Sequence, residues 1–289
     1  MDIAVLSVIY PGVEQYLNDF LRSLSKQTLM DFKLFLINDG VFDAMQLIKG
    51  LKCNFDIKGF KGTPSAIRKY GINWIINEGA EIILFADADD YFDENRLEAS
   101  IKFLVDHDLV VNELLLFGDG QVGLIPMLGK RLREGENLQA KHLKYSNCMG
   151  FSNTAMLTNK ISPDISRIPD HIIAFDWAFF TICLQSEINT VFTQKTKTYY
   201  RQHLNNSASP YFLSEEFILK GLRVKKDHYS FLSQLYKEYS QLAEVFEKLL
   251  KQLEMDNSLR QKYCRLVCSK SPEHPLWWES IKTIEELGL

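Results

Sequence analysis

Three aspartates that follow one apolar segment are the clearest sign of chemistry in this sequence. Asp87, Asp89 and Asp90 come directly after the apolar run Ile82–Ala86. Carboxylates that start from a buried strand are costly unless a cation joins them. Mg²⁺ and Mn²⁺ prefer oxygen ligands and share their coordination shell with substrate phosphates. Taken alone, this segment fits a divalent-cation site and a solvated acidic turn before the next helix equally well.

Two further segments carry groups that bind nucleotides or phosphate. Asn38-Asp39-Gly40 ends a second apolar run, and a carboxylate there can accept hydrogen bonds from a nucleobase imide or a ribose hydroxyl. The same residues also fit a plain Asx-type turn. Arg68 lies one turn inside a helix that Thr63-Pro64 opens, with Thr as the N-cap. A helix N-terminus with a guanidinium beside it binds phosphate, and a surface arginine is the alternative.

The elements that position these side chains follow from two periodicities in the first hundred residues. Continuous apolar runs predict buried strands, and apolar residues three and four apart predict helices. The predicted strands are Ile3–Ile9, Lys33–Asn38, Phe55–Gly59 and Glu81–Ala86, and the predicted helices are Val13–Ser25, Phe42–Lys49, one between Thr63 and Gly79, and Glu94–Asp106. This alternation predicts an α/β fold with a parallel sheet covered by helices. Since ligands bind beyond the carboxyl ends of such strands, Asp39 and the aspartates at 87–90 should share one edge.

The rest of the chain is less regular and then becomes helical. Short strands are predicted near Leu114–Phe117, Gln121–Met127, Met149–Ser152 and Asn189–Thr193, and a buried helix over Phe175–Gln185. One continuous apolar seam then runs through Phe231, Leu235, Tyr239, Leu242, Phe246, Leu249 and Leu253. The seam predicts packing on the same domain or a neighbouring helix, and it leaves open a homodimer through the C-terminal helices. We therefore divide the chain into a domain over 1–210 and a helical C-terminal region over 211–289.

Composition excludes several classes of protein. With 289 residues, 46% hydrophobic, the chain can bury a real core. Its net charge of −4 and pI near 5.9 argue against a nucleic-acid binder. No apolar run approaches the ~18 residues of a membrane span, and the N-terminus lacks a signal-peptide pattern.

Five scattered cysteines are typical of reduced thiols, so we expect a cytoplasmic protein. Residues 211–270 hold 11 Lys/Arg against 8 Asp/Glu, which fits either a solvated face or peripheral contact with an anionic membrane.

The order and spacing of these segments resemble the family 2 glycosyltransferases of the GT-A fold over the first 205 residues. Ile3–Ile9 resembles that family's opening strand, and Gln27-Thr28 with Asp31–Gly40 resembles its QT…DFE turn and VDDG strand end. Ser65–Ile72 resembles its G…ARN.GI helix, and Phe85–Asp90 its FLDADD metal motif. Further on, the chain resembles the segment before the acceptor site, the ED helix start and the YRQHxxNxS stretch, at Asn147–Ser152, Asp176-Trp177 and Tyr199–Ser207. The resemblance implies a Rossmann-like, mostly parallel sheet followed by a helical C-terminal region.

The resemblance also implies an activity and a set of roles. The enzyme would move a sugar from a nucleotide-diphosphate donor to a hydroxyl on a glycan or lipid-linked acceptor, with inversion, in polysaccharide or glycan assembly. Asp39 would contact the nucleobase or ribose, Arg68 would orient the nucleotide, and Asp87 would lie near the ribose. Asp89 would bind a Mn²⁺ or Mg²⁺ ion bridging the pyrophosphate, and His203 would be a further metal or phosphate contact.

The general base implied by the resemblance is Asp176, and here the sequence departs from the family pattern. The glutamate of the ED motif is Phe175, which leaves Asp170 as a nearby rival for the base. A buried aspartate that caps a helix is the structural alternative for Asp176. Asn38 replaces the first acidic residue of the strand end, and Tyr10-Pro11-Gly12 replaces the P.YN segment after the first strand.

These departures leave a second function open, a catalytically impaired module that binds nucleotide sugars without turnover. A sugar-phosphate nucleotidyltransferase with a related sheet is a further rival. Such an enzyme should carry a glycine-rich phosphate loop directly after the first strand, and Tyr10-Pro11-Gly12-Val13 is not one.

Overall fold

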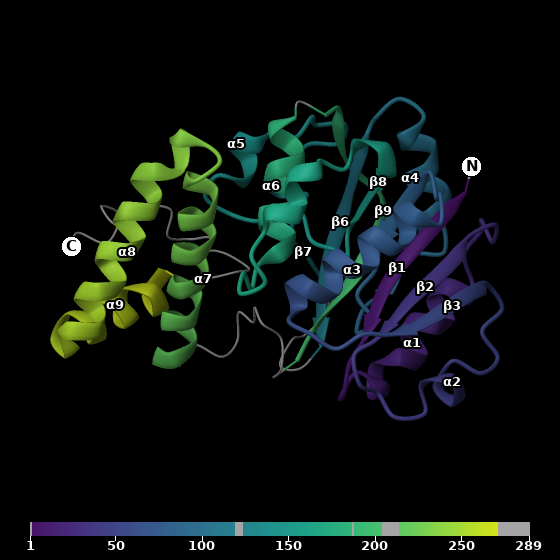
Figure 1. The fold of residues 1–289 in the computed structure, drawn as a ribbon, viewed down its shortest axis with the longest axis horizontal. Helices are drawn as coiled ribbons and strands as arrows, with labels where there is room; N and C mark the ends of the chain where they lie inside the picture. The colour runs from purple at the N-terminus through teal and green to yellow at the C-terminus, as the bar shows by residue number, and fades with distance from the viewer. Residues whose placement is uncertain (1, 119–123, 187, 204–213, 271–289) are drawn as a thin grey trace.

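The computed structural model describes residues 2–118, 124–186, 188–203 and 214–270. Within these ranges one sheet runs in the order β3-β2-β1-β4-β8-β6-β9-β5, with β7 paired to β6 (Figure 1). Its parallel half comprises β3 (Asn54–Gly59), β2 (Lys33–Asn38), β1 (Ile3–Ile9) and β4 (Ile82–Phe85). Its mixed half comprises β8 (Thr154–Leu157), β6 (Leu109–Gly118), β9 (Thr190–Gln202), β5 (Tyr91–Phe92) and β7 (Ile125–Pro126). The predicted α/β sheet is confirmed. Beyond β4 the pairing is mixed, because β8 runs antiparallel to both β4 and β6, whereas β6 and β9 are parallel.

The central strands β1, β2 and β4 are buried on both faces because they are apolar at nearly every position. Along β1, Leu6 belongs to the core on one face and Val5 to the core on the other. The first face is covered by α3 (Pro64–Asn77) and α6 (Phe175–Gln185), and the second by α1 (Glu14–Ser25), α2 (Ala44–Leu47) and α4 (Arg96–Leu104). Helices on both faces are what continuous apolar strands require.

Helix α3 approaches the sheet closely, and it carries Arg68. Thr63 caps its N-terminus as predicted, since the Thr63 hydroxyl accepts a hydrogen bond from the Ala66 amide at 3.2 Å. Gly71 makes the approach feasible, because a Cβ at this position would lie only 2.6 Å from Ile37 Cδ1. A larger residue at position 71 would push the helix, and with it Arg68, away from the strand ends.

The predicted strand Met149–Ser152 is wrong. Residues 147–150 have no regular secondary structure, residues 151–153 form a turn, and β8 begins only at Thr154. The Asn153 side chain accepts a hydrogen bond from the Gly150 amide at 2.7 Å, and the Thr154 hydroxyl donates to the Gly150 carbonyl at 2.8 Å. These side-chain bonds offer the backbone an alternative to a sheet ladder.

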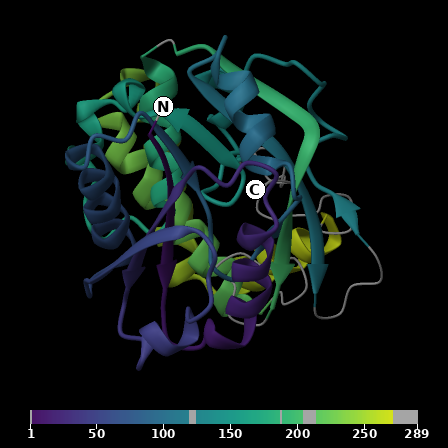
Figure 2. The same cartoon turned by 90° about the vertical axis from the view of Figure 1, so that its right-hand side faces the viewer.

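The other short strands of the middle region differ from the prediction in length. The segment Leu114–Phe117 lies inside the longer β6, and of the predicted Gln121–Met127 only β7 is a strand, with residues 119–123 outside the described part. Strand β9 continues to Gln202, well past the predicted end at Thr193. Its register against β6 shifts beside Asn112, and Figure 2 shows it as a long, bent ribbon. The bend carries the end of β9 back toward the strand ends of the parallel half.

The C-terminal region consists of α7 (Glu215–Ser233), α8 (Ser240–Met255) and α9 (Asn257–Lys270), with a 3₁₀ turn over Lys237–Tyr239. The expectation of one continuous seam is wrong, because the chain turns between Ser233 and Ser240 and splits the seam residues between α7, the turn and α8. The expected packing on neighbouring helices is confirmed, since Phe231, Phe246 and Leu253 are buried in the core shared with α6. The seam therefore faces its own chain.

The proposed boundary at residue 210 lies in a segment outside the described residues. In Figure 1 the helices α7–α9 lie at the opposite end of the molecule from β3. Among the described helices, none combines the length and the apolar character that a bilayer span requires.

Candidate active site at the carboxyl edge of the sheet

Two of the predicted acidic segments flank strand β1 at the edge where the parallel strands end. Asp39 directly follows β2, and its amide donates to the Ile9 carbonyl at 2.8 Å. Asp87 follows β4 on the other side of β1, where the Ala86 amide donates to the Leu6 carbonyl at 3.0 Å. Since strands are spaced ~4.8 Å apart, β2 and β4 lie about 10 Å from each other at this edge. The predicted shared edge is confirmed, and Asp39 is half-exposed there.

Arg68 reaches from α3 to Asp87. Its Nη2 lies 3.3 Å from Asp87 Oδ1, with 27% of the Arg68 side chain and 34% of the Asp87 side chain exposed. The guanidinium also lies over the Phe151 ring, 5.2 Å from its centroid. Partial removal from water raises the pKa of Asp87 to about 6, against the lowering effect of Arg68. Asp89 and Asp176 raise it further, so these carboxylates are close neighbours.

Asp89 is held by contacts from three separate elements. Tyr10, just after β1, donates its hydroxyl to Asp89 Oδ2 at 3.1 Å. His203, just after β9, places Nε2 at 3.1 Å from the same oxygen, and its ring stacks on Tyr16 of α1 at 4.9 Å between centroids. Arg201 Nε donates to the Asp89 backbone carbonyl at 2.8 Å. The predicted pair Asp89 and His203 is thus brought together across 114 residues of sequence.

Asp90 is a structural anchor in this arrangement. It is fully buried and accepts hydrogen bonds from the Ser152 hydroxyl and from the Arg201 amide, the latter at 2.8 Å. Burial, with the charges of Asp89 and Asp87, raises the pKa of Asp90 well above its ordinary value. These bonds join the end of β4 to the turn before β8 and to β9.

Arg96 is a buried cation beneath this acidic edge, and sequence reasoning missed it. It is 1% exposed, donates to the Phe85 carbonyl at 2.7 Å and to Asn112 Oδ1 at 3.2 Å, and lies over the Phe92 ring. Burial lowers its pKa to about 9, against the opposing effect of Asp90 and then of Asp87. In the sequence it looks like any arginine in the first turn of a surface helix, so no local signal could have singled it out.

Asp176 lies in the first turn of α6, and the positive charge of Arg68 acts on it. Its Oδ2 accepts a hydrogen bond from Asn147 Nδ2 at 3.0 Å, and its Oδ1 accepts from the Trp177 amide at 2.9 Å. Burial raises the pKa of Asp176, and Arg68 and these hydrogen bonds oppose the rise. Asn147 belongs to the segment Asn147–Ser152 that resembles the family, and the resemblance implies no role for it.

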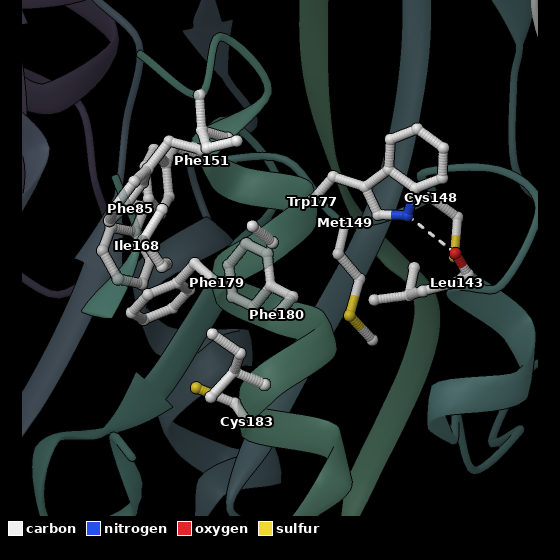
Figure 3. Packing of buried hydrophobic residues seen from close by; sticks show 14 of the residues in the cluster. Phe85, Leu143, Cys148, Met149, Phe151, Ile168, Trp177, Phe179, Phe180 and Cys183 are labelled. Atoms are coloured by element: carbon white, nitrogen blue, oxygen red, sulfur yellow. Dashed lines mark hydrogen bonds between the residues drawn. The ribbon is translucent and has the colours of Figure 1, made fainter. Parts of the chain in front are cut away.

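The residues on either side of Asp176 fix it in place. Phe175, which replaces the family glutamate, is 1% exposed and stacks on Phe179. The Trp177 indole donates to the Leu143 carbonyl at 2.7 Å, the bond drawn in Figure 3. Phe175 thus places an apolar ring in the core where the family has an acid, and Asp176 is the acidic residue of this turn whose charge acts on Asp87.

The rival Asp170 lies in a different setting. Its side chain is 60% exposed and pairs with Lys69 Nζ at 2.6 Å. Lys69 also donates to the Ile168 carbonyl at 2.8 Å, so the pair ties the loop before α6 to α3. Asp170 thus has a structural partner in Lys69, whereas the charge that acts on Asp176 is that of Arg68.

The donor set around Asp89 fits a hard divalent cation that a substrate helps to hold. Among the residues that the structure describes, no cluster of three or more His, Cys, Asp or Glu side chains is arranged to hold a cation. Asp89 offers a carboxylate, and the imidazole of His203 lies beside it with Nε2 at Oδ2. Mg²⁺ is commonly bound in this way, through one or two carboxylates together with substrate phosphates, and Mn²⁺ accepts the same oxygen ligands.

The curled α/β sheet with an acidic strand edge is that of the GT-A fold of nucleotide-sugar transferases. Comparison with known sequences agrees, since the family model described as glycosyl transferase family 2 matches residues 5–161. The chain belongs to glycosyl transferase family 2.

Two relatives support the same assignment, and two solved structures share the fold. An uncharacterized glycosyltransferase of Haemophilus influenzae is 24% identical over 196 residues, covering 64% of this chain and 74% of that protein. One of Rickettsia bellii is 32% identical over 112 residues, 37% of this chain and 16% of that protein. Staphylococcus aureus TarS 1–349 in complex with UDP-GlcNAc has a TM-score of 0.60 at 18% identity, covering 85% of this chain and 71% of that one. The Pyrobaculum calidifontis mannosyltransferase PcManGT, with GDP-Man and Mn²⁺, has a TM-score of 0.54 at 10% identity, covering 80% and 64%.

Proposed function

We propose that this glycosyltransferase is metal-dependent and inverting, and that it moves a sugar from a nucleotide-diphosphate donor to a hydroxyl acceptor. The observation that carries the proposal is the convergence of Arg68, Asp87 and Asp176 beside Asp89 at the carboxyl edge of the sheet. A cationic group, a cation-binding carboxylate and an enclosed base in one place are what sugar transfer from a diphosphate requires.

The donor half of the site would bind the nucleotide and stabilise the leaving group. Asp39 accepts a hydrogen bond from the nucleobase or ribose, and Asp87 lies at the ribose. Negative charge grows on the diphosphate as its bond to the sugar C1 stretches, and Arg68 lies where it can stabilise that charge. Asp89, with His203 as a further contact, would hold Mn²⁺ or Mg²⁺, which supplies Lewis-acid stabilisation of the same charge.

Asp176 would act on the acceptor. A hydroxyl is a poor nucleophile, so its proton must leave as it attacks C1, and a carboxylate within hydrogen-bond reach contributes ~10²–10⁴-fold. Burial raises the pKa of Asp176 and makes it a better proton acceptor. Attack from the face opposite the diphosphate inverts the anomeric centre, and one base suffices because no covalent enzyme intermediate forms.

The setting of the reaction follows by analogy with the family. The two structural neighbours were solved in complex with UDP-GlcNAc and with GDP-Man, which supports a nucleotide-sugar donor. We propose a glycan or lipid-linked sugar as acceptor, within cytoplasmic polysaccharide or glycan assembly. The mildly basic residues 211–270 would provide a peripheral membrane contact for a lipid-linked acceptor.

Two substitutions favour a second candidate function, a nucleotide-sugar-binding module without turnover. Phe175 and Asn38 replace acidic residues of the family pattern. Hydrolysis of a nucleotide sugar by the purified chain, which needs no known acceptor, separates the two functions. Release of nucleoside diphosphate identifies an enzyme, and binding without release identifies a module.

The experiment that tests the proposed function begins with thermal shifts in a panel of nucleoside diphosphates and nucleotide sugars, each with and without Mn²⁺. Asp89→Ala should abolish the Mn²⁺-dependent part of the shift. Asp176→Asn should abolish turnover and leave donor binding intact. Equal shifts with and without Mn²⁺ would contradict the metal assignment, and lost nucleotide affinity with normal turnover in Asp176→Asn would contradict the base.

A further inference from the structure

We propose that Tyr10 is a positioning residue for the cation-binding carboxylate of Asp89. Its hydroxyl fixes one carboxylate oxygen and leaves the other to coordinate the cation. This inference rests on the proposed function, because it takes Asp89 to be the cation ligand. It gives a role to the segment Tyr10-Pro11-Gly12, where this chain departs from the family pattern.

The position of Tyr10 is set by the strand that precedes it. Tyr10 follows β1 directly, and its carbonyl accepts a hydrogen bond from the Val13 amide at 3.1 Å, which turns the chain into α1. From this turn the half-buried phenol reaches across to Asp89 beyond the end of β4 and donates to Oδ2 at 3.1 Å.

The two oxygens of Asp89 are used differently. Oδ2 has Tyr10 Oη and His203 Nε2 at 3.1 Å each. A carboxylate oxygen offers about two lone-pair sites, so these two groups occupy Oδ2. Within the part of the chain that the structure describes, no residue donates a hydrogen bond to Asp89 Oδ1. Oδ1 is therefore the oxygen that can coordinate a cation without displacing a protein donor.

Tyr10 adds a restraint that the other contacts of Asp89 do not supply. Arg201 fixes the Asp89 backbone through its carbonyl and is itself held by Asp19 at 2.6 Å. That contact leaves the Asp89 side-chain torsions free to rotate. The Tyr10 hydroxyl and the His203 ring stop this rotation from opposite elements, β1 and β9. When the ligand side chain is already ordered, less conformational entropy is lost as the cation binds. Removal of the outer partners that order a metal ligand typically weakens metal binding 10–100-fold.

The chain offers a matched control for this hydrogen bond. Tyr199 donates its hydroxyl to Asp93 Oδ1 at 3.0 Å, so it makes the same kind of bond at nearly the same length. Asp93 belongs to the segment that enters α4 and is not a proposed cation ligand. Tyr10→Phe and Tyr199→Phe therefore each remove one hydroxyl and one tyrosine–carboxylate bond, and only Tyr10→Phe loosens Asp89.

The test is a titration of the full chain with Mn²⁺, followed by the electron paramagnetic resonance signal of the free ion, with and without UDP and GDP. We expect Tyr10→Phe to raise the Kd for Mn²⁺ about tenfold, with a melting temperature in the absence of metal like that of Tyr199→Phe. Tyr199→Phe should bind Mn²⁺ like the wild type.

The outcomes separate this inference from the function on which it rests. An unchanged or tighter Mn²⁺ affinity in Tyr10→Phe overturns the positioning role, and so does an equal loss in Tyr199→Phe. If the wild-type chain itself binds no Mn²⁺ under any of these conditions, the cation assignment in the proposed function fails, and the inference fails with it. Mn²⁺ binding that Asp89→Ala leaves intact has the same consequence.

Discussion

The buried imidazole of His228 predicts a loss of stability in mild acid. His228 lies on α7 with 0% of its surface exposed, and its ring stacks on Trp177 of α6 with 3.9 Å between centroids. Neither ring nitrogen has a hydrogen-bond partner among the described residues. Burial, reinforced by the charge of Lys225, lowers the pKa of His228 to about 3. The folded protein therefore accommodates only the neutral ring.

The size and sign of the effect follow from this pKa and the unfolded value of 6.5. Between pH 3 and 6.5 the unfolded chain binds a proton at His228 and the folded chain does not. The contribution to stability is fully present above pH 6.5 and falls on acidification by about 1.4 kcal/mol per pH unit. At pH 5 the loss from this group amounts to about 2 kcal/mol.

Urea unfolding at pH 7 and pH 5 measures this contribution in wild type and in His228→Phe, which keeps a stacked ring and removes the titrating group. The free energy of unfolding should fall about 2 kcal/mol less in the variant than in the wild type over this interval. Tyr229→Phe is the control, because it removes a neutral hydrogen bond to the Lys144 carbonyl (2.9 Å) and should cost about 1 kcal/mol at both pH values. An equally steep fall in wild type and His228→Phe would refute the reasoning.

Three further predictions concern the site. Arg96→Met removes the buried cation beneath Asp90 and should lower the free energy of unfolding in urea by about 3 kcal/mol; a loss below about 1 kcal/mol would show that Asp90 needs no such partner. Asn147→Ala releases one oxygen of Asp176 and should lower kcat about tenfold, or ~1.4 kcal/mol in barrier, at unchanged donor KM; a change in KM alone would contradict the positioning of the base. Asp170→Asn should leave kcat near the wild-type value in the same assay, and a loss as large as that of Asp176→Asn would move the base to Asp170.

The parallel half of the fold was predictable from sequence, because its signals are local and strong. The strands Ile3–Ile9 and Lys33–Asn38 and the helix Phe175–Gln185 have the predicted bounds. Each is a dense apolar run, so propensity, periodicity and burial agree. The site edge followed from topology, since parallel strands with short crossovers place Asp39 and Asp87 beside the same central strand.

The rest could not be predicted, because it depends on contacts between distant residues. The seam spacing of three and four continues through residues 234–239, so periodicity alone does not reveal the turn that separates α7 from α8. The turn at 151–153 depends on the Asn153 side chain, whose bond to Gly150 competes with strand pairing. Tyr10 and Asp89 are 79 positions apart, and their bond exists only once β1 and β4 are paired. The role of Arg96 as a buried cation depends on its burial, which its local sequence does not indicate.

The central claim is that one nucleotide-sugar site lies at the carboxyl edge of the parallel strands. A crystal structure of the chain with a nucleoside diphosphate and Mn²⁺ tests it most directly. We predict the cation on Asp89, the diphosphate beside Arg68, the nucleobase or ribose at Asp39, and open space in front of Asp176 for the sugar and its acceptor. A nucleotide bound elsewhere on the molecule, or a cation that bridges the diphosphate without Asp89, would contradict the account.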